Sequence, residues 1–436
     1  MTAILFRKFI SNLAVSNREE ISTTYKRITR RLNRDFRDSD SEFAHSLQVG
    51  SFGRGTAIDG ISDLDMVFEL SPRAFERFRE RAGNGPSAML QAVKQSLLET
   101  FPGTKIRGDG PVVTAPFRNM HFEILPAFLQ DDGSYIYGVT KHGGSWEPTD
   151  PRAERDEFAR VSEASGGLLR DLARMLRAWK NKHGVAISGW LIDTLCYDFV
   201  VARPQWRGAA HDDYLDIVID AFDYLAGLAD DGAWLAPGSG ARVTSYGKFT
   251  TKASRAATKC RMARDKDTLE GQSTLLRGVF GKSFELMEER YGGDVRTLIA
   301  RAGPLEEFVE DRYTMDIRHD VRIDYEVSFN QQILLDLIHL PRRFRRLIPG
   351  RSVRFYIAET TVPNLDVCDI FWKVRNRGPN ARGQERGQLL PDEGRHERVE
   401  HTKFDGPHYV EVYVVQEGRC IARDRAPVQI VEEGSN

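Results

Sequence analysis

Hydrophobic residues recur at helical spacing along the first forty positions of the chain. The apolar positions that set this period are Phe6, Phe9, Ile10, Leu13, Tyr25, Ile28, Leu32 and Phe36. Because side chains three and four residues apart share one face of a helix, the pattern predicts a helix over residues 5–38. Its opposite face carries the basic residues Lys26, Arg27, Arg30, Arg31, Arg34 and Arg37. Such a face is either solvated or a surface for nucleic acid, and both interpretations stay open.

The next segment alternates strand and helix patterns. Short apolar runs predict strands near 63–70, 111–117 and 121–128, with a helix near 86–99 between the first two. Helical periodicity then dominates from about 156 to 300. The clearest case is "GGLLRDLARMLRAWKNKHG", whose apolar stripe runs from Leu168 to Trp179 and which Gly184 ends.

The pattern changes again after Pro304, which follows "RAG" and predicts a domain boundary. From about 320 the runs "SVRFYIAETTV", "CDIFWKVRNRG", "HYVEVYVVQEG" and "APVQIVEE" are rich in β-branched and aromatic residues, which favours strands. The Arg-, Gly- and Glu-rich stretch 377–400 predicts a mobile loop. We therefore expect an α+β chain: a mixed-sheet core with a helical lobe (about 156–300) in residues 1–300, and a β-rich domain in 305–436.

Composition narrows the class of protein. The 436 residues carry a formal net charge of −1, which gives no overall attraction to nucleic acid or to an anionic membrane. Charge at Arg7 and Lys8 comes too early for a signal peptide, and no apolar run approaches the ~20 residues of a membrane span. Four widely spaced cysteines predict reduced core thiols: Cys196, Cys260, Cys368 and Cys420. We expect a cytoplasmic protein without a membrane partner.

Candidate chemistry is concentrated in "VGSFGRGTAIDGISDLDMVFEL", residues 49–70. Alternation along a strand places Asp63 and Asp65 on one face, where two ionised carboxylates repel each other unless a cation lies between them. A second strand, "NMHFEILPAF", adds Glu123 between two apolar residues. Three acids on neighbouring strands could hold two Mg²⁺ or Mn²⁺ ions, the arrangement used for displacement at phosphorus.

The glycine-rich turn before these acids suits a triphosphate. Gly50 allows close approach of backbone amides and Ser51 adds a hydroxyl donor, although the spacing is not that of a Walker A loop. Lys180, at the edge of the apolar stripe, and Ser188, at a predicted helix start, could hold a leaving pyrophosphate.

Each residue also has a purely structural interpretation. The Gly-Ser pair could be an ordinary turn, the paired aspartates a solvated strand end, and Glu123 a partner for His121. Lys180 could simply extend from an amphipathic helix, and Ser188 could be a plain helix cap. Turn, paired acids and strand acid in this order and spacing are much harder to obtain by chance, which favours nucleotidyl transfer.

These strings, "LNRDFR…LQVGSFGRGTAIDGISDLDMVFEL", "HFEILPAF" and "LLRDLARMLRAWKNKHGVAISGWLIDTL", resemble the bacterial cyclic-oligonucleotide synthases. These are the CD-NTases of anti-phage signalling, within the DNA polymerase β-like nucleotidyltransferase superfamily. The resemblance covers residues 5–300, and residues 305–433 are similar to the C-terminal sensor domain often fused to these synthases. It implies a polymerase β-like nucleotidyltransferase core, with the mixed sheet and helical lobe described above.

The resemblance also assigns roles to residues. It implies that Gly50 and Ser51 hold triphosphate, that Asp63, Asp65 and Glu123 hold catalytic metal, and that Lys180 and Ser188 grip the donor's phosphates. The expected activity is synthesis of a cyclic di- or oligonucleotide second messenger from ATP, GTP or both, with release of pyrophosphate. The alternatives are transfer of nucleotides to RNA or protein, and a catalytically silent nucleotide or nucleic-acid sensor.

A basic run in the C-terminal part, "PRRFRRLIPGR", is a candidate anion or ligand patch through Arg342, Arg343, Arg345 and Arg346. It contains no acid, and it does not distinguish nucleic acid from a nucleotide or a protein. We expect residues 305–433 to regulate the core by binding an activating ligand.

Overall fold

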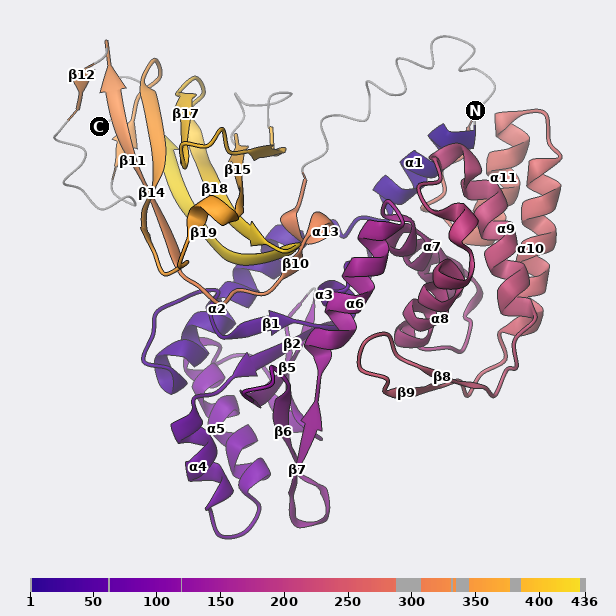
Figure 1. Ribbon diagram of the computed structural model, residues 1–436, viewed down its shortest axis with the longest axis horizontal. Coiled ribbons are helices and arrows are strands. Elements are labelled where there is room, and N and C mark those ends of the chain that lie inside the picture. Colours follow the sequence, from indigo (N-terminus) through magenta and orange to yellow (C-terminus); the bar gives the residue numbers. More distant parts are fainter. Residues whose placement is uncertain are drawn as a thin grey trace. The chain divides into compact units, whose positions relative to one another are not determined.

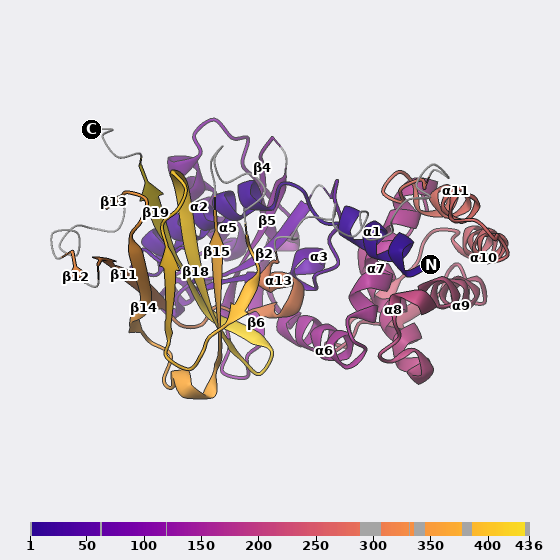
Figure 2. The ribbon, with the colours of Figure 1, turned by 90° about the horizontal axis from the view of Figure 1, so that it is seen from above.

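The fold was analysed in a computed structural model, which describes residues 2–61, 63–118, 120–287, 307–330, 332–334, 345–376 and 386–431. The chain divides into two compact units. The first comprises Met1–Asp38 with Gln48–Leu298, and the second comprises Ser39–Leu47 with Ile299–Asn436. Figure 1 shows the ribbon and Figure 2 the same ribbon from above. A short N-terminal segment thus belongs to the C-terminal unit.

Helices make up most of the first unit. They are α1 (Thr2–Asn12), α2 (Arg18–Phe36), α3 (Gly50–Gly53), α4 (Pro72–Arg79), α5 (Gly85–Thr100), α6 (Pro151–Ala164), α7 (Leu168–His183), α8 (Gly189–Ala202), α9 (Tyr214–Ala226), α10 (Thr250–Arg264) and α11 (Leu269–Phe280). One short helix, α13 (Val309–Arg312), lies in the second unit.

The first unit contains a mixed sheet ordered β1-β2-β5-β4-β3, with β6 added to β5 and β7 to β6. Its strands are β1 (Ser46–Gln48), β2 (Asp63–Glu69), β3 (Arg107–Asp109), β4 (Val112–Pro116), β5 (His121–Leu129), β6 (Tyr135–Val139) and β7 (Ser145–Thr149). β2 and β5 run parallel, whereas β4 and β6 are antiparallel to β5. A small hairpin, β8 (Ala233–Leu235) with β9 (Arg242–Thr244), lies among the later helices.

One face of this sheet is covered by α2 and α5. Leu64 and Met66 of β2 and Ile124 of β5 are fully buried in a core that also contains apolar residues of both helices. Since alternate residues of a strand point to opposite faces, the residues between them lie on the other face of the sheet. Those residues include the three acids singled out above.

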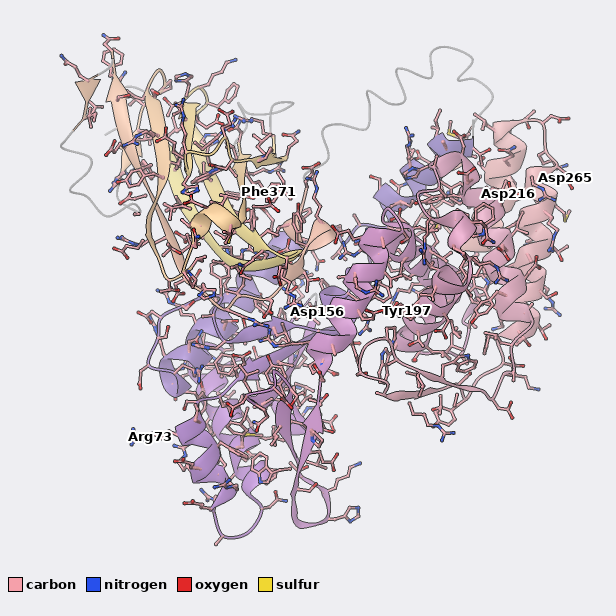
Figure 3. All side chains as sticks on the ribbon, viewed as in Figure 1. Arg73, Asp156, Tyr197, Asp216, Asp265 and Phe371 are labelled. Atoms are coloured by element: carbon pink, nitrogen blue, oxygen red, sulfur yellow. The ribbon has the colours of Figure 1, made fainter. Side chains whose placement is uncertain are left out.

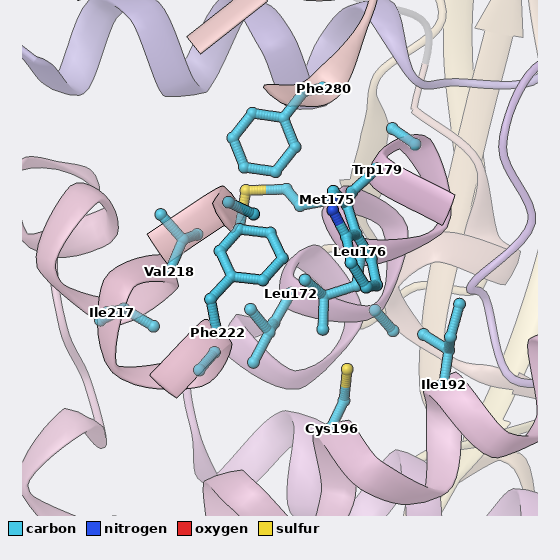
Figure 4. Packing of buried hydrophobic residues seen from close by; sticks show 14 of the residues in the cluster. Leu172, Met175, Leu176, Trp179, Ile192, Cys196, Ile217, Val218, Phe222 and Phe280 are labelled. Carbon is cyan, nitrogen blue, oxygen red and sulfur yellow. The ribbon is translucent and has the colours of Figure 1, made fainter. Parts of the chain in front are cut away.

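The later helices form a second core around α7. Met175, Leu176 and Trp179 are buried there, and Trp179 meets Phe222 of α9 edge-to-face at 5.2 Å between ring centroids (Figure 4). Gly184 ends α7 in the left-handed conformation, with φ of 55°, as the sequence predicts. Asp216 of α9 and Asp265, the C-cap residue of α10, are exposed to solvent (Figure 3).

The C-terminal unit contains two sheets, ordered β10-β19-β18-β15-β16, with β13 beside β19, and β12-β11-β14-β17. Apolar residues of both sheets share one core. The strands are β10 (Thr314–Met315), β11 (Val321–Phe329), β12 (Gln332–Ile333), β13 (Arg346–Leu347), β14 (Ser352–Thr360), β15 (Asp369–Arg375), β16 (Leu389–Pro391), β17 (Glu397–His401), β18 (Gly406–Gln416) and β19 (Arg419–Ile430).

Two sequence expectations need correction. The helix expected over 5–38 is broken at residues 13–17, where Ser16 donates from its backbone N–H and its hydroxyl to Asp59, at 2.9 and 2.6 Å. The loop expected over 377–400 contains β16 and β17, because a polar segment can pair as an edge strand through its backbone. Residues 377–385 of that stretch lie outside the described residues.

Two smaller expectations have mixed outcomes. Cys196, Cys260 and Cys420 are buried free thiols, whereas Cys368 is only half-buried. The helical lobe is described as far as Met287, and the remainder of 156–300 lies outside the described residues. Within the part of the chain that the structure describes, no helix has the length and apolar character needed to span a bilayer.

Candidate active site

The three candidate acids lie on the sheet face opposite the core. β2 and β5 pair in parallel with Asp65 opposite Glu123 and Asp63 opposite His121. Paired residues of neighbouring strands lie about 4.8 Å apart, so Asp65 and Glu123 are direct neighbours. His121, considered from the sequence as a partner for Glu123, has its Nδ1 atom 3.7 Å from Asp63 Oδ1 and also lowers the pKa of Glu123 electrostatically, against the larger effect of burial.

The glycine-rich turn packs directly against one of these acids. Gly50 begins α3 with φ of +59°, and a Cβ atom at this position would lie 1.9 Å from Asp65 Oδ2. Both the backbone conformation and the space therefore require glycine. Ser51 follows as a buried residue, and the backbone N–H of Val49 donates to the Asp65 carbonyl at 3.0 Å. The turn and the acids thus form one local structure.

Burial and mutual repulsion make the acid group costly to ionise. Burial raises the pKa of Asp65, Arg54 opposes this effect, and Asp63 raises the pKa further. Burial also raises the pKa of Glu123, as do Asp65 and Asp63. A bound cation would remove this repulsion and favour the ionised carboxylates, which are the donors that Mg²⁺ and Mn²⁺ prefer.

The carboxylates of Asp63, Asp65 and Glu123 are therefore suitable ligands for a divalent metal, although their side chains do not converge on one position. Among the residues that the structure describes, no three His, Cys, Asp or Glu side chains form a closed ligand group. Asp63 is half-exposed at the start of β2 and can approach by rotating its side chain. The backbone positions are set by the strand register, which leaves only side-chain torsions to adjust.

Lys180 and Ser188 lie near the two ends of the loop that joins α7 to α8. Lys180 is half-buried in the last turn of α7. Ser188 is exposed at the N-cap of α8, where its Oγ atom accepts the Leu191 N–H at 3.0 Å. The capping interpretation of Ser188 is therefore confirmed, and it remains compatible with a phosphate contact.

A buried ionic network that sequence reasoning missed connects the turn to α7 and α8. Asp193 of α8 accepts hydrogen bonds from Arg54 Nε (2.9 Å), Thr56 Oγ1 (2.9 Å) and two nitrogens of Arg177 (3.1 and 2.8 Å). Although burial opposes ionisation of Asp193, Arg177 and Arg54 outweigh it and lower its pKa. Arg174 also donates to the Gly55 carbonyl at 2.8 Å. The network fixes the segment after the Gly-Ser turn against both helices.

The sequence offered a weak signal for this network. Asp193 is an acid inside the apolar run "GWLIDTL", and Arg174 and Arg177 are three residues apart on α7, one turn before Lys180. An acid in an apolar helix indicates a buried pair, because an isolated buried charge is too costly. Its partners lie 139 and 16 positions away, however, and no periodicity identifies them.

The four arginines of the candidate anion patch in the C-terminal unit do not form one surface in the part that the structure describes. Arg345 is buried, and its Nη1 atom donates to Asp324 at 2.7 Å and to the Tyr325 carbonyl at 2.6 Å. It stabilises the fold and is not open to a surface anion. Arg346 is exposed on β13, whereas Arg342 and Arg343 lie outside the described residues.

Two sequence models of protein families match the chain. Residues 1–161 match the Second Messenger Oligonucleotide or Dinucleotide Synthetase domain, and residues 304–431 match the Adenylyl/Guanylyl and SMODS C-terminal sensor domain. A probable cyclic nucleotide synthase of Bacillus cereus strain VD146 is 26% identical in an alignment of 190 residues, which covers 37% of this chain and 57% of that relative.

Solved structures also resemble the chain at low sequence identity. E. coli MS115-1 CdnC with ATP is 16% identical, with a TM-score of 0.48 over 65% of this chain and 99% of that one. The Bradyrhizobium diazoefficiens CD-NTase CdnG in complex with GTP is 15% identical, with a TM-score of 0.46 over 65% of this chain and 96% of that one.

Proposed function

We propose that this chain, which belongs to the bacterial CD-NTase family, joins ribonucleotides into a cyclic di- or oligonucleotide second messenger in anti-phage defence. The observation that carries the proposal is the packing of the Gly50 turn against Asp65, with Glu123 beside Asp65 in register. A phosphate cradle and paired carboxylates on one face of the sheet are what nucleotidyl transfer needs.

In the proposed reaction, Gly50, Ser51, Lys180 and Ser188 hold the β- and γ-phosphates of an ATP or GTP donor. A ribose hydroxyl oxygen of the second nucleotide attacks the α-phosphorus, its proton is lost, and the bond to the bridging oxygen breaks to release pyrophosphate. The linear product then turns in the pocket, and a second transfer with a second pyrophosphate released closes the ring.

The family is metal-dependent, and Asp63, Asp65 and Glu123 are the residues that would hold metal here. Two Mg²⁺ or Mn²⁺ ions would lower the pKa of the attacking hydroxyl and stabilise charge on the α-phosphate. The raised pKa values of Asp65 and Glu123 support this assignment, because burial and the neighbouring carboxylates disfavour the ionised forms, which a bound cation would stabilise.

Product chemistry tests the proposal. Purified protein with ATP, GTP and Mg²⁺ or Mn²⁺ should yield a small product that resists phosphatase, because a ring, unlike the substrates and the linear intermediate, has no terminal phosphate. The Asp63→Ala, Asp65→Ala double variant should make none. Nucleotide label that becomes attached to added RNA or protein, with no small cyclic product, would favour the alternative transferase, and a fully active double variant would refute the metal assignment.

We further propose that the C-terminal unit regulates the transfer site through residues 39–47. Within that unit, the Arg423 guanidinium lies 5.0 Å from the Phe43 ring centroid and 5.1 Å from that of Tyr413. Phe43 also packs against a small apolar cluster of the unit. The segment ends within β1, and the Gly50 turn follows that strand, so that a shift of the segment would be transmitted to the cradle.

Removing the Phe43 ring tests this route. A desolvated cation–π contact contributes about 2 kcal/mol, which is enough to change a two-state equilibrium about 30-fold. Phe43→Ala should therefore change the transfer rate, whereas Phe329→Ala should not, although its ring also lies under an arginine (Arg351, 4.0 Å) in the same unit. Equal rates for the two variants would count against the route.

A further inference from the structure

A cavity of about 180 Å³ opens between the two sheets of the C-terminal unit. Its floor is apolar and includes Val353 and Phe355 of β14, Val410 of β18, and Val428 and Ile430 of β19. All five side chains are buried. Since the strands come from both sheets (β14, β18 and β19 in Figure 1), the cavity is an unfilled part of their shared core, and the exposed lining residues His401 and Lys403 place its mouth at the surface.

The volume limits what the cavity can take. An apolar protein cavity of about 150 Å³ accommodates benzene and stays free of water. A volume of about 180 Å³ therefore admits the apolar part of one ring or a short branched chain. Protein interiors are normally packed without voids of this size, which makes a cavity open to solvent a candidate binding site.

The mouth of the cavity is positively charged. Arg386 donates to both carboxylate oxygens of Glu400, at 2.5 and 3.1 Å, and Arg398 donates to the same carboxylate at 2.8 Å. Glu400 is the one acid among the residues that line the cavity, and Lys403 stands exposed at the rim. The two arginines that share the Glu400 carboxylate, together with the exposed Lys403, leave an excess of positive charge at the mouth, which favours an anionic ligand group.

The position of Arg386 is set by an unusual backbone. Its φ is +56°, in the left-handed region that side chains other than glycine, asparagine and aspartate rarely adopt. Arg375 donates to the Arg386 carbonyl at 2.7 Å, and Glu400 holds its guanidinium. Such conformations persist where several contacts impose them, and they occur often at ligand clamps.

We propose that this cavity binds a small amphipathic anion, with an apolar or aromatic body of about one ring in the floor. Its carboxylate or phosphate group would lie against Arg386 and Lys403. Binding at this cavity does not depend on nucleotidyl transfer. The further idea that the bound anion regulates the transfer site rests on the proposed function. The site differs from the arginine run at 342–346, whose Arg345 is already paired.

Calorimetric titration of the full chain with phenyl phosphate, benzoate, benzyl alcohol and inorganic phosphate tests the proposal. Phenyl phosphate should bind about tenfold more tightly than benzyl alcohol or inorganic phosphate, because it alone supplies both ring and phosphate, and benzoate should also exceed the alcohol. Lys403→Glu, at the exposed rim, should weaken both anions about tenfold without threatening the fold. Val428→Phe should remove binding by filling the floor.

The matched control is Arg322→Gln, since Arg322 also pairs with an acid, Glu359, in the same unit but does not line the cavity. It should leave the affinities unchanged. Repeating the titration with Asp63→Asn protein separates this site from the transfer site, because binding should persist there. The proposal is overturned if Lys403→Glu and Val428→Phe bind phenyl phosphate as the wild type does, or if the ring adds nothing to inorganic phosphate.

Discussion

Replacing Asp193 by asparagine would test whether the buried ionic network holds the phosphate-binding turn in place. The substitution keeps the side-chain shape but removes the charge that two buried arginines, Arg54 and Arg177, share. The side chain of Asp193 is 2% exposed and those of both arginines are 9% exposed. Removing one partner of a buried pair costs about 3–5 kcal/mol, because the arginines stay buried without their main counter-charge. We therefore expect Asp193→Asn to lower the free energy of unfolding by about 3–5 kcal/mol.

Chemical denaturation followed by tryptophan fluorescence would measure this loss. Five of the six tryptophans lie in the first unit, so the signal reports chiefly on that unit. The control is Asp220→Asn, because Asp220 accepts from Trp206 at 2.9 Å but its side chain is 28% exposed. A partly exposed pair of this kind contributes about 1 kcal/mol or less.

The loss of stability caused by Asp193→Asn should depend on pH in a defined direction. The folded pKa of Asp193 is lowered, so its stabilising contribution is complete above the unfolded pKa of about 4 and is lost as the pH falls through the folded value. The difference between wild type and Asp193→Asn should therefore shrink in acid. A loss at pH 7 no larger than that of Asp220→Asn would refute the role given to the network.

Three further predictions follow from the site. Gly50→Ala should abolish nucleotidyl transfer through its clash with Asp65, whereas Gly60→Ala, also at positive φ (+81°) but with nothing within 4 Å, should stay active in the same product assay. The rise in melting temperature on adding Mn²⁺ should be lost as the pH falls through the raised pKa values of Asp65 and Glu123, since protons then compete with metal. Ser188→Ala should lower the free energy of unfolding by about 1 kcal/mol through loss of the α8 cap, measured by urea denaturation.

The elements that the sequence predicted well are those with strong local periodicity. The apolar stripe of α7 and the alternation around Leu64 and Met66 each depend on neighbouring residues alone, and the paired acids follow from the second. The break at residues 13–17 was missed because Asp59, 43 positions away, holds Ser16. β17 was missed because its charged residues resemble a loop, and its pairing with distant β14 decides the structure.

The candidate site likewise combines features that neighbouring residues determine with features that distant contacts determine. Gly50, Ser51, Asp63 and Asp65 belong to one short motif, so their proximity could be predicted. The register that places Glu123 opposite Asp65 depends on strand pairing across 58 positions, and it was expected only in outline. The Asp193 network and the packing of residues 39–47 within the C-terminal unit depend on contacts between residues far apart in the sequence. No local pattern could therefore predict them.

The most direct test of the central claim is a Mn²⁺ titration followed by electron paramagnetic resonance, with no nucleotide present. If the acids on this face of the sheet form the metal site, wild-type protein should remove free Mn²⁺ from solution at pH 7.5, and the Asp65→Asn, Glu123→Gln variant should bind at least about tenfold more weakly. The double variant Asp216→Asn, Asp220→Asn in the helical lobe should bind as the wild type does. Equal Mn²⁺ binding by the Asp65, Glu123 variant and the wild type would contradict the account.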